Sequence, residues 1–264
     1  MLRRIKQSLY RLLALSAIRV PATVLMKVAS TNEVPALGPV PAADTVVVLA
    51  PHMDDETIGC GGAIAAHVRA GAKVHVIFLT DGVKGFEPQE LRQVSFEVRR
   101  ETRVRESEAA CEILGVAQAH YLNMPDGESK PSNEAAQRLL ATLEAINPDL
   151  AYLPFLTDTH HDHQTCIRLF LDACSKKPVF DSLLCNCYEV WTPLHPNQIL
   201  DITEDMPQKM AALACYDSQL KMNDYLSSVK GLNAYRAIAN RSQGYAEAFY
   251  LTTVARYRQL MDQR

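Results

Sequence analysis

The sequence lacks two features that would place it in a specialised class. Positive charge is not in excess, because 27 Lys and Arg against 30 Asp and Glu give a formal net charge of −3, so composition gives no reason to expect a nucleic-acid partner. A membrane-spanning run is also missing from the N-terminal region, where the apolar stretch Leu12–Ile18 is too short and is followed by Arg19 and Pro21. The sequence therefore predicts no bilayer-spanning segment in this region.

Paired cysteines are absent as well. The seven cysteines are odd in number and form no CxxC pair, and Cys185 and Cys187 are too close in sequence to bridge each other comfortably. This usage predicts reduced thiols and a cytoplasmic location, not a disulfide framework. The 264 residues contain no internal repeat or low-complexity tract, and their ordinary apolar and charged fractions are typical of one large globular domain.

Acidic residues are missing from the first 32 positions, which hold six Lys or Arg. Apolar residues recur there at helical spacing, at Leu2, Ile5, Leu9, Leu12 and Leu13. The pattern predicts a basic amphipathic helix, and it leaves open peripheral contact with the inner membrane surface or packing of the helix on the domain. Three prolines between Val34 and Pro41 predict a linker. We therefore divide the chain into an N-terminal segment with its linker, residues 1–40, and a domain of residues 41–264.

The stretch Thr45–Gly62, TVVVLAPHMDDETIGCGG, carries the main chemical signal. Its apolar run Val46–Ala50 predicts a strand that is buried on both faces of a parallel sheet. One histidine and three acids follow the strand directly: His52, Asp54, Asp55 and Glu56. Ligands bind at the carboxyl ends of strands in open α/β sheets, and a divalent cation would relieve this crowding of negative charge. The alternative is acids placed against a helix N-terminus, although capping needs only one.

Further strands and helices alternate along the chain. Apolar runs predict strands over Lys73–Leu79, Ala119–Leu122 and Leu150–Leu153, and helical patterns predict helices over Val94–Leu114 and Ser132–Ile146. Strands separated by helices indicate right-handed βαβ units. The sequence thus predicts an α/β fold with a mainly parallel sheet.

A second cluster, Asp158–His163, follows the last of these predicted strands. His160 and His163 are three residues apart, so they face the same way in a first helical turn. A catalytic zinc site uses three protein ligands and keeps a fourth position open. His52, Asp55 and one histidine of this cluster would supply such a set, for zinc or another divalent first-row ion such as Fe²⁺.

These residues carry a resemblance to a known family. PHMDDETIGCGG resembles the HxDDE signature of the PIG-L/LmbE family of metal-dependent N-deacetylases, and HHDH resembles its second motif, HxDH. Other parts of the chain resemble family features as well, at Arg103 and Glu106 (RxxE), Met124–Gly127 (PDG turn), Asp201–Thr203 (DIT), Lys209, and Ala246–Phe249. The resemblance implies a Rossmann-like three-layer fold. It also implies hydrolysis of an N-acetyl group on an N-acetylglucosamine-type sugar conjugate, with metal-bound water as the nucleophile.

The resemblance further implies the metal ligands His52, Asp55 and His163. It implies that Asp54 is the general base, that a protonated His160 stabilises the oxyanion, and that the Asp162 carboxylate orients His160.

Arg103 is a candidate for binding a sugar hydroxyl or a phosphate, and a helix-surface salt bridge with Glu106 is the alternative.

Three other functions stay open at this point. The glycines of GCGG follow a strand, as in dinucleotide-binding proteins, but they do not form GxGxxG and acids would repel a pyrophosphate there. A metal-dependent phosphoesterase is the second possibility, and a non-catalytic, membrane-associated metal-binding protein is the third.

Overall fold

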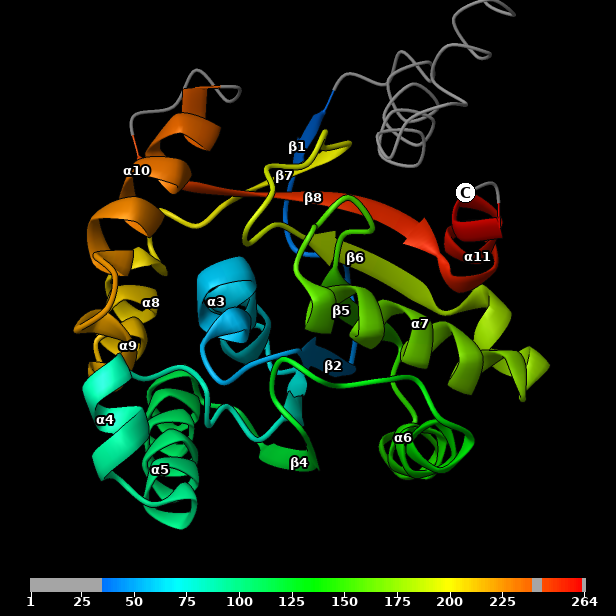
Figure 1. The fold of residues 1–264 in the computed structure, drawn as a ribbon. Coiled ribbons are helices and arrows are strands. Elements are labelled where there is room, and N and C mark those ends of the chain that lie inside the picture. Colours follow the sequence, from blue (N-terminus) through cyan, green and yellow to red (C-terminus); the bar gives the residue numbers. More distant parts are fainter. Residues whose placement is uncertain (1–34, 239–243, 263–264) are drawn as a thin grey trace, which may run out of the picture.

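The computed structural model describes residues 35–238 and 244–262 of the chain (Figure 1). Its described strands form one sheet of eight, in the order β1-β7-β8-β6-β5-β2-β3-β4. In chain order these are β1 (Ala36–Gly38), β2 (Thr45–Ala50), β3 (Lys73–Thr80), β4 (Gln118–Met124), β5 (Leu150–Pro154), β6 (Leu184–Tyr188), β7 (Gln198–Asp201) and β8 (Ala246–Thr253). Only β8 runs against its neighbours in this described sheet, and every other pairing is parallel. The predicted α/β class with a mainly parallel sheet is confirmed.

Helices cover both faces of the sheet (Figure 1). One layer holds α3 (Asp55–Arg69), α4 (Pro88–Gln93), α5 (Phe96–Leu114), α8 (Met206–Leu213), α9 (Asp217–Leu220) and α10 (Tyr225–Ala237). The other layer holds α6 (Asn133–Ile146), α7 (His161–Ser175) and α11 (Val254–Asp262), with the short 3-10 helix η1 (Pro178–Ser182) beside it. No described helix is both long and apolar enough to cross a bilayer.

The continuous apolar run of β2 follows from this layering. Val46 and Val48 pack in the core beneath α3, α5 and α8, whereas Val47 and Leu49 pack in the core beneath α6 and α7. Since successive side chains of a strand point to opposite faces, a strand covered on both sides has no solvent-facing position for polar residues.

The parallel arrangement brings four strand ends together. β2 pairs with β3 on one side and β5 on the other, and β3 pairs with β4. The segments that follow their carboxyl ends therefore meet at one edge of the sheet. After β2 the chain continues on one side of it, to β3 and β4, and then crosses to the other side, to β5. Open α/β sheets bind ligands at such switch points.

Several predicted boundaries differ from the structure. Ala36–Gly38, inside the predicted linker, forms strand β1 and pairs with β7. The predicted helix Val94–Leu114 is α5, which begins two residues later because Val94 is extended and Ser95 caps the helix through its side chain, and α4 is a separate helix before it. The predicted amphipathic helix lies outside the described residues, and the division at residue 40 stays a prediction.

Candidate active site

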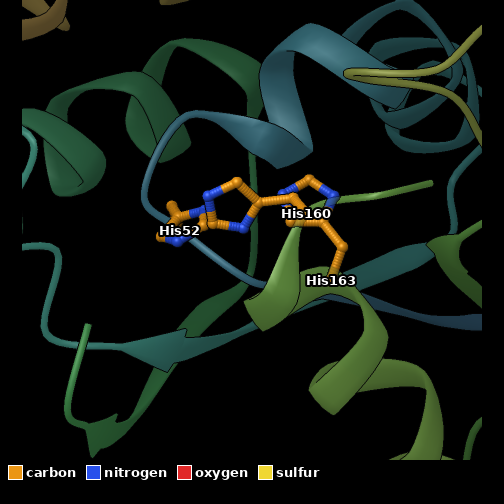
Figure 2. A group of neighbouring side chains, drawn as sticks. All are labelled: His52, His160 and His163. Carbon is orange, nitrogen blue, oxygen red and sulfur yellow. The ribbon is translucent and has the colours of Figure 1, made fainter. Parts of the chain in front are cut away.

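A cavity of about 280 Å³ opens where the four strand ends meet. It is lined by the β2–α3 loop, the segment after β3, the turn after β4, the start of α7 and the loop after β6. Figure 2 shows that His52, His160 and His163 gather here, with His52 on the β2–α3 loop and the other two at the start of α7. The two sequence clusters, separated by about a hundred residues, therefore form one site, as predicted.

Asp55 lies between two of these histidines. Its Oδ2 is 3.2 Å from His52 Nδ1 and 3.1 Å from His163 Nε2. Burial by itself would raise the pKa of Asp55, but the facing His163 and His52 hold it well below its usual range. The structure thus brings together the three side chains predicted as metal ligands, and we call them the histidine–aspartate cluster.

His163 is held as metal-binding histidines are. Its Nδ1 lies 3.0 Å from Asp158 Oδ2, which places the ring proton on Nδ1 when the imidazole is neutral. Its Nε2 is buried and makes no hydrogen bond of standard geometry, although Asp55 is near. A carboxylate that orients one ring nitrogen while the other faces a ligand is the usual outer-shell arrangement of a metal site. The residues therefore fit a divalent cation.

The site offers more potential metal ligands than the three that were predicted. Ligand atoms of His52, His160 and His163 lie within 4.8 Å of one another, and so do those of His52, Asp126 and Asp162. All are nitrogen or oxygen donors, which suit zinc and other first-row ions.

Asp54 has an unusual backbone. Its φ is 151° and its ψ is −26°, a conformation that residues with a side chain rarely adopt and that costs on the order of 1–3 kcal/mol. The carboxyl group is buried beside the cavity, and burial raises its pKa to about 6 despite the nearby Arg103 guanidinium. Strain and a pKa close to neutrality are both features of functional carboxylates.

Arg103 forms the salt bridge with Glu106 that the sequence offered as an alternative, but the pair is buried and does not lie on a helix surface. Its guanidinium donates to the Met53 carbonyl and, at 3.4 Å each, to Glu106 and Ser218. It also lies 3.5 Å from Asp54 Oδ2. Arg103 therefore braces the loop that carries Asp54, while still lining the cavity.

The predicted pairing of Asp162 with His160 is also wrong. The Asp162 carboxylate contacts His52 Nε2 at 3.0 Å, accepts from Gly127 N at 2.8 Å and accepts from Ser129 Oγ. Only the backbone N–H of Asp162 reaches His160, where it donates to Nδ1 at 3.3 Å. Burial and the neighbouring histidines lower the pKa of His160, which favours the neutral ring, and because Nδ1 accepts from the Asp162 backbone, that neutral ring carries its proton on Nε2.

Three residues with a place in the site were not predicted. Asp158 accepts from the backbone N–H groups of His160 and Trp191 while it faces His163. Asp126 lies 3.5 Å from His52 Nε2, and its position in the PDG turn was the available signal. Trp191 stacks on His160, but nothing local in the sequence marks it.

Helix α3 is broken just after the site. Cys60 has φ −147° and ψ 23°, which interrupts the helical hydrogen bonds. Lys209 Nζ donates to the Ile58 carbonyl at 2.9 Å, and Glu247 accepts from Gly62 N and Ala63 N at 2.8 Å each. The pair therefore satisfies the backbone groups on both sides of the break, and we call it the Lys209–Glu247 brace.

The glycines at this break serve close packing. A Cβ on Gly59 would overlap the Tyr188 ring, and one on Gly62 would lie 2.7 Å from Ile202. Neither glycine lines the cavity. Their positions account for the GCGG run without a phosphate-binding loop.

The comparison with known families is consistent with this geometry. Residues 47–174 match the PIG-L family model, which is described as GlcNAc-PI de-N-acetylase. The chain contains a PIG-L family domain. The matched residues span β2 to α7 and include both sequence clusters, and the predicted resemblance to the PIG-L/LmbE family is confirmed.

Relatives of the PIG-L domain carry two kinds of name. Diacetylchitobiose deacetylase of Thermococcus kodakarensis is 27% identical over 188 residues, which cover 66% of this chain and 69% of that protein. A 4-oxalmesaconate hydratase of Pseudomonas putida is 26% identical over 225 residues, 77% of this chain and 87% of that protein. Among solved structures, N,N'-diacetylchitobiose deacetylase of Pyrococcus horikoshii superposes with a TM-score of 0.72 at 22% identity, covering 92% of this chain and 95% of the other.

Proposed function

We propose that this protein is a metal-dependent hydrolase that removes the N-acetyl group from an N-acetylglucosamine-type sugar conjugate. The class agrees with the family match and with the deacetylases named among the relatives. The observation that carries the proposal is His163 Nε2, which is buried, makes no hydrogen bond of standard geometry, and lies 3.1 Å from Asp55 Oδ2 and next to a strained acid. A buried polar atom without a hydrogen bond is costly, and a bound cation removes that cost.

We assign the metal to His52, Asp55 and His163. When bound, a zinc-type ion supplies a Lewis acid and lowers the pKa of a coordinated water to about 7. Burial raises the pKa of Asp54 to about 6, so this carboxylate can take a proton from the attacking water at neutral pH and return it to the leaving amine. The strained backbone and Arg103 fix its position for that transfer.

His160 has a donor role in this proposal. Because its Nδ1 accepts from the Asp162 backbone, the neutral ring carries its proton on Nε2. That N–H can donate to the acetyl oxygen as negative charge develops there, in the manner of an oxyanion hole. The Asp162 carboxylate acts instead on His52 and on the turn after β4.

Hydration of an unsaturated carboxylate is the second candidate, because one relative is named as a hydratase. A polycarboxylate substrate needs unpaired cations. The lysine and the arginine that line the cavity, among the described residues, both already face carboxylates: Lys84 faces Glu128 at 2.7 Å, and Arg103 faces Asp54 and Glu106. The cavity therefore favours an uncharged substrate over a polycarboxylate.

Metal analysis combined with an acetate-release assay on N-acetylglucosamine and diacetylchitobiose tests the proposal. We expect about one divalent ion per chain, loss of activity on chelation, and recovery on adding zinc. Asp55→Ala and His163→Ala should each lose the ion. His161→Ala is the matched control, because the exposed His161 ring contacts the Ser129 carbonyl instead of the cluster. Full metal retention in Asp55→Ala and His163→Ala would refute the ligand assignment. Turnover of 4-oxalmesaconate or of a generic phosphate ester, without acetate release, would show that the protein is a hydratase or a phosphoesterase and not a deacetylase.

A further inference from the structure

Trp191 is an exposed aromatic side chain at the rim of the active-site cavity. It lies in the loop between β6 and β7 and is 54% exposed. One face of its indole stacks on His160, with ring centroids 6.0 Å apart and planes 18° apart. Trp191 lines the cavity together with Met222, which is also exposed. Exposed apolar side chains that gather at the rim of a polar cavity, unlike single ones elsewhere on a surface, indicate a place for a ligand.

The loop that carries Trp191 is rigidly anchored. The Trp191 backbone N–H donates to Asp158 Oδ2 at 3.2 Å, and Leu194 N donates to Glu189 Oε2 at 2.7 Å. Arg236 from α10 donates to both Glu189 oxygens and to the Leu194 carbonyl. The indole position is therefore fixed before a ligand arrives, which reduces the entropy lost on binding.

The anchoring also ties the indole to the proposed chemistry. Asp158 holds the Trp191 backbone, the His160 backbone and the His163 ring with its two oxygens. A ligand lying against the indole is thus placed in a fixed relation to both histidines.

We infer that Trp191 is the platform on which a pyranose ring of the substrate lies, and that this ring is uncharged. The inference rests on the proposed deacetylase function and deepens it. An indole offers a broad, rigid apolar face that matches the C–H face of a sugar, while its N–H remains free to bond a hydroxyl. The apolar side chains Ile58, Val190, Met222 and Tyr225 extend the lining, and the two cations of the cavity are already paired.

The chain contains one tryptophan, so tryptophan emission excited at wavelengths that tyrosine does not absorb reports on this position alone. Titration of the metal-loaded full-length protein with diacetylchitobiose should change the tryptophan emission saturably, at the concentration that gives the KM for acetate release. N-Acetylglucosamine 6-phosphate should bind no more tightly than N-acetylglucosamine. Emission that stays constant while the enzyme turns the sugar over would overturn the platform, and markedly tighter binding of the phosphate ester would overturn the uncharged ring.

Kinetics of variants give a second readout. Trp191→Ala should raise KM for diacetylchitobiose about 3- to 10-fold, the range expected for losing one aromatic stacking contact, with kcat nearly unchanged. Trp191→Phe should restore most of the loss. Phe96→Ala, an exposed aromatic that does not line the cavity, is the matched control.

The outcomes separate this inference from the proposed function. A fall in kcat without a change in KM in Trp191→Ala would mean that the indole only positions His160, and the platform would be wrong. Saturable fluorescence change with diacetylchitobiose in a protein that releases no acetate would keep the platform and refute the deacetylase. Acetate release without a change in tryptophan emission, and with an unchanged KM in Trp191→Ala, would keep the deacetylase and refute the platform.

Discussion

Two groups of buried charged residues hold helix α3, and they differ in how completely they are satisfied. In the Lys209–Glu247 brace, both side chains are almost fully buried, with 0% and 1% of their side-chain surface exposed, and their charged atoms have backbone or ionic partners. In the histidine–aspartate cluster, which holds the first turn of the same helix, His163 Nε2 lies near Asp55 without a hydrogen bond of standard geometry, and the adjacent Asp54 is strained.

The difference indicates two uses of buried charge. A pair whose hydrogen bonds are complete fixes the chain and has no capacity left for a ligand. A cluster that has a ring nitrogen without a good hydrogen bond and a strained neighbouring residue is less stable. It keeps a nitrogen that can still bind a ligand. We therefore expect substitutions in the cluster to change activity and substitutions in the brace to change the free energy of unfolding.

The largest effect is expected from Asp54→Asn. Loss of the proposed general base should lower kcat for acetate release about 10²- to 10⁴-fold while metal content and melting temperature stay close to those of the wild type. Asp149→Asn is the control, because Asp149 is an exposed acid that accepts from Asp44 N and Thr45 N. If Asp54→Asn retained wild-type kcat, another residue would have to act as the base.

Lys209→Met should have the next largest effect, and on stability. Removing one partner of a buried ion pair leaves Glu247 uncompensated, which costs about 3–5 kcal/mol of unfolding free energy in denaturant titrations. Lys221→Met is the control. Its exposed pair with Asp217 should contribute less than about 1 kcal/mol.

A double substitution sharpens this result. Replacing both Lys209 and Glu247 by apolar residues still leaves Gly62 N and Ala63 N without their acceptor. Stability should therefore not return to the wild-type value. Full recovery in the double variant would mean that the brace is only an ion pair and does not serve the break in α3.

The smallest effect concerns pH and a histidine outside both groups. His67 is buried with its Nε2 2.9 Å from the Tyr152 hydroxyl, and burial lowers its pKa to about 4. In the unfolded chain it titrates near 6.5, so between these values the unfolded state binds a proton that the folded state does not, and stability falls as pH decreases. Across that window the loss should approach about 3 kcal/mol. Parallel stability–pH curves for the wild type and His67→Gln would contradict this assignment.

The fold and much of the site could be predicted because their signals are local. The apolar runs of β2, β3 and β5 reflect coverage on both faces, and Ser132 caps α6 as the sequence indicates. Strand ends meet in a parallel sheet, so His52 and Asp55 could be expected to converge with one histidine of Asp158–His163, and the family resemblance pointed to His163.

What could not be predicted depends on contacts across the fold. Asp162 lies two residues from His160 in sequence, yet its carboxylate turns to His52 and Gly127, because α7 directs it toward the turn after β4. The break in α3 depends on Lys209 and Glu247, which come from α8 and β8. Trp191 gains its place from Asp158 and Arg236, far away in the chain.

The backbone of Asp54 has a consequence for protein engineering. Glycine adopts its φ of 151° without the steric cost, so Asp54→Gly relieves strain and removes a buried carboxyl group in one step. Selection for thermal stability alone would favour that change, and it would deliver a better-folded protein without its proposed base. Variants selected for a higher melting temperature should therefore be sequenced at position 54 and assayed for activity before they are accepted.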